Sequence, residues 1–113
     1  MSDFVMTYPG FFLLNDHDAP ELVEIDGKLC VCFFTDTELV ATFYRDKHGK
    51  GAEHAQVIAA HSRAELLQIL GQWQPVFDND GIRFVAFDVS PRRRPMYGEL
   101  GEFIAMLEAE QAD

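Results

Sequence analysis

An unbroken apolar run that leads straight into a helix-start signal constrains this chain more than any other stretch. Residues 29–38 read LCVCFFTDTE, and the first six side chains are all apolar. Alternate side chains of a strand share a face, so a strand over residues 29–34 would be apolar on both faces. Such strands are typical of sheets that are covered on both sides. A buried helix segment is the alternative interpretation.

The residues after this run favour the strand. Thr35 and Glu38 have the spacing of a capping box, in which each side chain accepts a hydrogen bond from the backbone amide of the other residue. The pattern predicts a helix that starts at Thr35 and runs to about Lys47. Gly49 follows, where a left-handed residue commonly closes a helix.

The segment before the apolar run predicts an antiparallel hairpin. Asp26-Gly27 separates two apolar runs, and this dipeptide is the strongest short-range signal for a type I′ turn. Residues 22–25 therefore pair with the central strand. A further short strand is expected at residues 11–14.

The remaining chain alternates strands with helices. Ser62 and Glu65 repeat the capping-box spacing after a predicted strand at residues 55–60, and this second helix is expected to end at Gly71 or Pro75. A strand at residues 82–89 and a helix from about Gly98 complete the order. The sequence predicts an α/β fold in a single domain, residues 1–113. Its one mixed sheet has about five strands, an N-terminal antiparallel hairpin and then βαβαβ, with three helices.

Charge and composition restrict the partners. The 113 residues carry a net charge of -10, which opposes binding to nucleic acid and to anionic membranes. The charge permits a basic protein partner, or it serves only solubility. No signal peptide or membrane-spanning run is visible, and two cysteines make no disulfide framework. We therefore expect a cytoplasmic protein with reduced thiols.

Three stretches resemble the N-terminal domain of the SseB-like bacterial proteins. They are CVCFFTDTELVATFY, SRAELLQIL and GIRFVAFDVSP, which together cover about residues 28–91. The family strand often ends in Asn-Pro, where this chain has Asp88-Val89-Ser90-Pro91. The resemblance implies a bacterial accessory protein of poorly defined biochemistry without an established active site, so no catalytic residue is carried over.

Topology gives the best argument for a site. Ligands of parallel sheets bind beyond the carboxyl ends of the strands, near helix N-termini. The residues expected at that edge, as a hypothetical ligand-binding set, are Thr35, Asp36, His61, Ser62, Asp88 and Ser90. In the alternative interpretation Thr35 and Ser62 only cap their helices. A hydrolase triad of Ser62, His61 and Asp88 is a weaker hypothesis, because the nucleophile-elbow motif is missing.

Other polar groups allow two interpretations each. Cys30 and Cys32 could join a metal site, but core thiols explain them without a ligand. Residues 15–20 and residues 78–81 contain metal-ligand side chains, yet neither has a regular ligand spacing, and both are interpreted as turns. No metal or other cofactor is predicted.

The basic residues Arg92, Arg93 and Arg94 form a patch between two prolines in an otherwise acidic chain. They could bind a partner's acidic group, or they pair with this protein's own acids.

Three functions remain open. The first is a non-enzymatic accessory domain that binds a protein partner or itself. The second is a small-molecule, anion-binding protein or enzyme with its site at the strand ends. The third is an acidic immunity-type protein that binds a basic toxin.

Overall fold

The predicted central strand forms as β3 (Lys28–Phe33) and lies inside a four-stranded sheet. The computed structural model describes residues 8–15, 17–49, 51–90 and 96–109. The other strands are β1 (Gly10–Leu14), β2 (Leu22–Ile25), β4 (Gln56–Ala60), β5 (Phe84–Phe87) and β6 (Met96–Glu99). The helices are α1 (Thr37–His48), the 3₁₀ turn η1 (Ala52–His54), α2 (Arg63–Asp80) and α3 (Leu100–Ala109).

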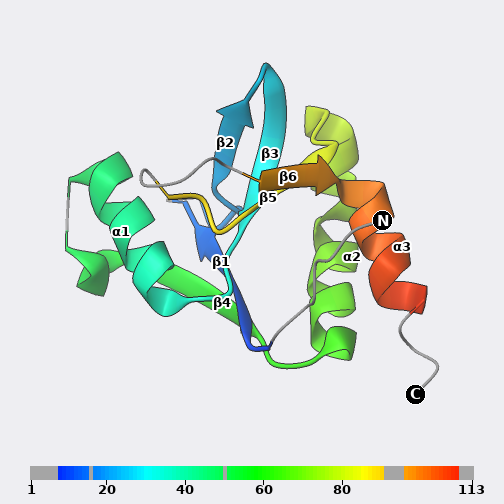
Figure 1. The fold of residues 1–113 in the computed structure, drawn as a ribbon, viewed down its shortest axis with the longest axis horizontal. Helices are drawn as coiled ribbons and strands as arrows, with labels where there is room; N and C mark the ends of the chain where they lie inside the picture. Colours follow the sequence, from blue (N-terminus) through cyan, green and yellow to red (C-terminus); the bar gives the residue numbers. More distant parts are fainter. Residues whose placement is uncertain (1–7, 16, 50, 91–95, 110–113) are drawn as a thin grey trace.

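The four-stranded sheet has the order β2-β3-β5-β6 (Figure 1). β2 and β3 form the predicted antiparallel hairpin, and Asp26 and Gly27 both have positive φ, 54° and 77°, as a type I′ turn requires. β3 pairs with β5 in parallel, and β6 adds an antiparallel edge. The predicted mixed α/β class is therefore confirmed.

The prediction of a single five-stranded sheet was wrong in detail. β1 and β4 pair with each other in a second, two-stranded sheet. Phe11 and Phe34 join the two sheets by exchanging backbone hydrogen bonds of 2.7 and 2.9 Å. Phe12 and Leu13 are fully buried on opposite faces of β1, so this strand needs cover on both sides and lies between β3 and β4.

Helices cover both faces of β3, as its two apolar faces predicted. α1 lies on one side of the sheets, and α2 and α3 lie on the other (Figure 1). Val31 and Phe33 belong to the apolar cluster that α2 and α3 complete. Cys32 and Phe34 belong to the cluster under α1.

The helix ends correct three expectations. α1 starts at Thr37, with Asp36 as its N-cap in place of Thr35. α2 passes through Pro75 and continues to Asp80, because the fully buried Phe77 anchors its last turns. The predicted turn at residues 78–81 is thus helical up to Asp80 and closes at Gly81 with φ 71°.

The last correction concerns residues 96–99, which the sequence assigned in part to a helix from about Gly98. They form β6, and α3 begins one residue after it, at Leu100. The backbone amide of Leu100 donates to the carbonyl of Arg83 at 2.9 Å. The sequence of this strand, MYGE, contains no β-branched residue. Residues 96–99 therefore form a strand because they pair with β5.

Candidate functional site

The carboxyl ends of the parallel strands β3 and β5 bring two predicted site residues into direct contact. The Asp88 carboxylate accepts hydrogen bonds from the backbone amide and the hydroxyl of Thr35, each 2.7 Å long. The backbone amide of Asp88 donates to the carbonyl of Phe33 at 2.9 Å. Asp88 has φ 49°, a left-handed conformation that Asp tolerates better than most residues. This contact replaces the helix cap that Thr35 was expected to make.

Asp36 lies beside this contact and caps α1. Its carboxylate accepts a hydrogen bond of 2.8 Å from the backbone amide of Glu38. Both oxygens of Asp88 already accept from Thr35. The three residues are therefore engaged in holding the end of β3 and the start of α1.

His61 and Ser62 lie on the far side of β1 from this group. β1 runs antiparallel to β4 and meets the end of β3 through Phe11, so β3 and β4 run in the same direction with β1 between them. Two strand spacings of about 4.8 Å separate the ends of β3 and β4 by roughly 10 Å. Both residues are exposed. The topology thus places the predicted residues at one edge, but in two groups.

The second helix cap forms with one difference from the expected box. The Ser62 hydroxyl accepts from the backbone amide of Glu65 at 3.2 Å, as predicted. The Glu65 carboxylate accepts from the backbone amide of His61 at 2.8 Å, one residue before the predicted partner. Ser62 and the His61 backbone therefore serve the start of α2.

Ser90, the last member of the predicted set, lines a separate cavity of about 350 Å³. The cavity also contacts Leu22 and Val23 of β2, and Phe43 and Lys47 of α1. Arg92, Arg93 and Arg94 lie outside the described residues.

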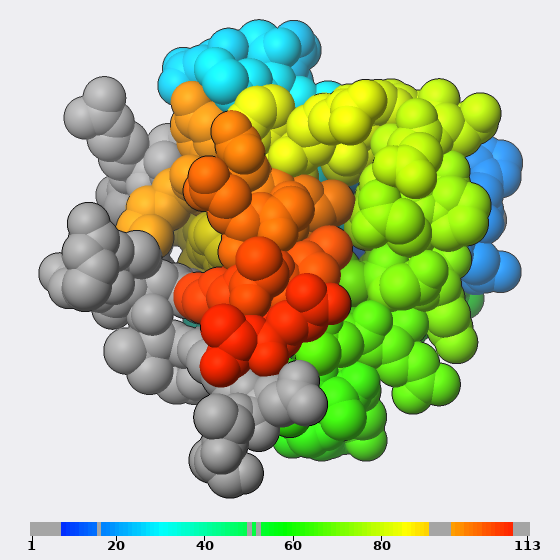
Figure 2. Space-filling model, turned by 90° about the vertical axis from the view of Figure 1, so that its right-hand side faces the viewer, coloured from blue at the N-terminus to red at the C-terminus, as the bar shows by residue number. Residues whose placement is uncertain are grey.

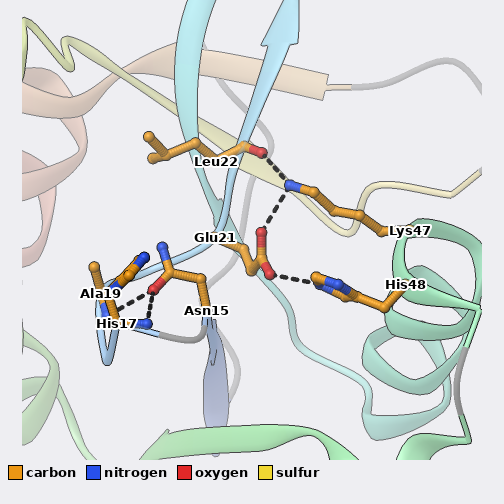
Figure 3. Close-up of polar contacts among 7 residues, drawn as sticks. All are labelled: Asn15, His17, Ala19, Glu21, Leu22, Lys47 and His48. Carbon is orange, nitrogen blue, oxygen red and sulfur yellow. Dashed lines mark hydrogen bonds and ion pairs between the residues drawn. The ribbon is translucent and has the colours of Figure 1, made fainter.

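A buried carboxylate that the sequence analysis missed lies next to this cavity. Glu21 is only 3% exposed, and its two oxygens lie 2.7 Å from Lys47 Nζ and 2.8 Å from His48 Nε2 (Figure 3). Lys47 also donates to the carbonyl of Leu22 at 3.2 Å. The ring of His48 packs on Tyr44, with 4.7 Å between ring centroids. These contacts tie the end of α1 to the start of β2.

Charge and hydrogen bonding hold Glu21 ionised. Burial raises the pKa of this carboxyl, but the hydrogen bonds and charges of Lys47 and His48 outweigh burial and bring the pKa below its ordinary value of 4.5. Because an ionised carboxylate can only accept, His48 Nε2 must carry a proton in this contact. In the sequence, the only local sign of this cluster is that the acidic Glu21 directly precedes an apolar strand. This pattern does not predict that Lys47 and His48 are its partners.

The loop before Glu21 is a polar turn, as predicted. The Asn15 side chain accepts hydrogen bonds from the backbone amides of His17 and Ala19, at 2.8 and 3.2 Å (Figure 3). Within the described parts of the chain, no group of three or more His, Cys, Asp or Glu side chains could hold a metal ion.

Cys30 and Cys32 are both fully buried, and neither is in a disulfide. Burial raises the pKa of both thiols, that of Cys32 to about 12. A thiol in this state is a poor nucleophile and a poor metal ligand, so packing accounts for both side chains.

A larger, apolar groove lies on the opposite side of the molecule from the Glu21 cluster, between β6 and α3. Its volume is about 410 Å³. Val85 and Phe87 of β5 line it together with Phe103 and Met106 of α3. In Figure 2, α3 crosses the middle of the view, and yellow atoms of β5 are visible at the floor of a hollow beside it.

Comparisons with known proteins add no family. No family model matches the chain, and no curated protein matches it. Among the described helices, none is both long enough and apolar enough to cross a membrane.

Proposed function

We propose that this chain is a non-enzymatic accessory domain that binds another protein in the bacterial cytoplasm, as the resemblance to SseB-like proteins implies. The observation that carries the proposal is the apolar groove between β6 and α3. Met96, one of the residues that line it, is 57% exposed.

The strand-end residues give less support to a function in catalysis or anion binding. The carboxylates of Asp36 and Asp88 lie at the N-terminus of α1, where they would repel an anion. The side chains of Thr35, Asp36, Ser62 and Asp88 already make hydrogen bonds within the protein. Anion binding at this edge therefore remains the second hypothesis, and an acidic immunity-type protein the third.

A pull-down from native lysate tests the proposal. The tagged chain is incubated at low and high salt, beside a variant with Arg92, Arg93 and Arg94 changed to Ser. We expect a stoichiometric protein partner with the wild-type chain. Loss of that partner in the variant would assign the contact to the arginines.

Two results together would contradict the proposal. The pull-down would capture no protein partner, and anions or nucleotides would raise the melting temperature of the chain in a thermal-shift screen. A ligand that binds only the folded state raises this temperature by mass action. That result would favour the second hypothesis.

A further inference from the structure

We infer that the contacts of Glu21 with Lys47 and His48 form an acid-sensitive latch between α1 and the sheet. The latch holds the C-terminal end of α1 closed over Cys32. Protonation of the Glu21 carboxylate lets this end of the helix move away while the sheet and the other helices stay folded. The inference goes beyond the proposed function and does not depend on it.

The carboxylate is anchored on the sheet, and both of its partners are on the helix. The backbone amide of Glu21 donates to the carbonyl of Leu13 on β1 at 2.8 Å, and its carbonyl accepts from the amide of Cys32 on β3 at 3.1 Å. Lys47 and His48, at 2.7 and 2.8 Å from the carboxylate, are the last two residues of α1 (Figure 3). Loss of the side-chain contacts would therefore free the helix end and leave these backbone hydrogen bonds in place.

The charge of the carboxylate decides whether the latch is closed. Burial raises the pKa of Glu21, but the hydrogen bonds and charges of Lys47 and His48 on α1 outweigh burial and bring this pKa below 4.5. On the sheet side, the thiol of Cys32, whose pKa burial raises to about 12, stays neutral in this pH range. Since release of α1 returns the pKa of Glu21 toward its ordinary value, the closed state is fully favoured above pH 4.5. It loses this advantage as the pH falls through the lower pKa of the closed state.

The helix that the latch holds has a small buried anchor. Of the 12 residues of α1 only Val40 and Tyr44 are buried, whereas α3 buries three of its ten. Residues 45–47 are exposed, so side-chain burial adds little to the contacts with Glu21 at the helix end. Segments with few buried apolar contacts open at a lower cost in free energy than the whole protein. The end of α1 can therefore open before the chain unfolds.

The two cysteines of β3 distinguish local opening from global unfolding. Both thiols are fully buried, but they belong to different apolar clusters. Cys32 lies in the cluster to which α1 contributes Tyr44. Cys30 lies in a cluster with Ile25 of β2 and Ala86 of β5. Movement of α1 would expose Cys32 and leave Cys30 covered, whereas global unfolding would expose both.

The reactivity of each thiol between pH 7 and pH 3 tests the inference. Cys30→Ala leaves Cys32 as the single thiol, and Cys32→Ala leaves Cys30. Each variant is treated with 4,4′-dithiodipyridine, a disulfide that modifies thiols in acid as well as at neutral pH. The rate is divided by that of the same variant in guanidinium chloride at the same pH, which removes the pH dependence of the reagent. The fluorescence of Trp73, the single tryptophan, reports on the cluster that α2 and α3 complete, where it packs on Phe12.

We expect acid to expose one thiol selectively. The normalised rate of Cys32 should rise at least about tenfold as the pH falls below 4.5, because the charged hydrogen bonds of the latch are lost. Over the pH range of this rise, the rate of Cys30 and the fluorescence of Trp73 should stay close to their values at pH 7.

Variants of the latch should open it without acid. In the Cys30→Ala chain, Glu21→Gln should raise the rate of Cys32 at pH 7 at least about tenfold and make it less dependent on pH. Glu24→Gln, at an exposed position of β2, is the matched control and should leave the rate unchanged. If Glu21→Gln fails to fold, Lys47→Met, which removes the charge and keeps an unbranched side chain, should raise the rate at pH 7 instead.

Three results would overturn the inference. A rise in the rates of Cys30 and Cys32 together, with a change in the fluorescence of Trp73, would show that acid unfolds the whole chain. A rate of Cys32 that keeps its neutral value until the chain unfolds would show that α1 does not open. An unchanged rate of Cys32 in folded Glu21→Gln at pH 7 would show that other contacts hold the helix end.

Discussion

Thr35 donates two hydrogen bonds to the carboxylate of Asp88, one from its backbone amide and one from its hydroxyl, and each is 2.7 Å long. The two residues are 53 positions apart in sequence and follow the parallel strands β3 and β5. The contact therefore fixes the relative positions of two strand ends and of the helix that begins after Thr35.

Asp88→Asn should lower the free energy of unfolding by about 1.5–3 kcal/mol, the usual contribution of hydrogen bonds to a charged group. Asn tolerates the left-handed backbone of Asp88, so the loss would report on the carboxylate and not on backbone strain. Urea denaturation measures the change. Thr35→Val removes only the hydrogen bond from the hydroxyl. It should lower the free energy of unfolding less in the Asp88→Asn variant than in the wild-type protein. Strictly additive costs would contradict the direct contact.

The lowered pKa of Glu21 predicts a loss of stability in acid. The unfolded chain takes up a proton near pH 4.5, while the folded chain resists it, so stability is fully present above pH 4.5 and falls as the pH drops through the folded pKa. Glu21→Gln should cost about 1.5–3 kcal/mol at pH 7 and should flatten the decline below pH 4.5. Denaturation curves from pH 7 to pH 3 measure both effects.

The matched control for this prediction is Glu24→Gln. Glu24 is an exposed residue on β2, in the same segment of chain as Glu21. Its replacement should leave both the stability and the acid decline close to those of the wild-type protein. An equally steep acid decline in Glu21→Gln and in the wild type would show that Glu21 is not the group responsible.

The two cysteines should resist thiol reagents in the folded protein. With its pKa at about 12, Cys32 is a thiolate in a fraction on the order of 10⁻⁴ at pH 8, and both sulfurs are buried. A disulfide reagent that reports free thiols should detect none in buffer and two in guanidinium chloride. The variants Cys30→Ala and Cys32→Ala should each show one thiol after denaturation. Rapid modification of the native protein would contradict the buried position of β3.

Two glycines should respond in opposite directions to the same substitution. Within α2, Gly71→Ala adds a methyl group that has no described heavy atom within 4 Å apart from the helix's own backbone, and it should stabilise the protein by about 0.5–1 kcal/mol. Gly10→Ala would place its Cβ against the ring of Phe33, and should cost about 1–3 kcal/mol. Thermal denaturation measures both. Equal effects would show that β1 does not approach Phe33 as closely as described.

Much of the fold follows from residues a few positions apart. The turn at Asp26 and Gly27 and the left-handed Gly49 after α1 formed as the sequence predicted. The two apolar faces of β3 predicted cover on both sides. These features depend on backbone preferences and on side-chain alternation, which a local stretch of sequence specifies by itself.

Contacts between distant residues decided the rest. Local spacing assigned Thr35 to a helix cap, but the Asp88 carboxylate offers its amide and hydroxyl a charged acceptor. Glu21 contacts Lys47 and His48, which lie 26 and 27 positions away in the sequence. No local pattern predicts these contacts. The topology rule did place Thr35, Asp36 and Asp88 at one edge of the sheet.

The sequence by itself determined the hairpin, the two-faced central strand and the α/β class, because each depends on short-range geometry. Only the tertiary structure decided that β1 would separate β4 from β3, that residues 96–99 would form an edge strand and that Glu21 would be buried. The physical reason is that strand pairing and charge burial take their free energy from partners far away in the chain.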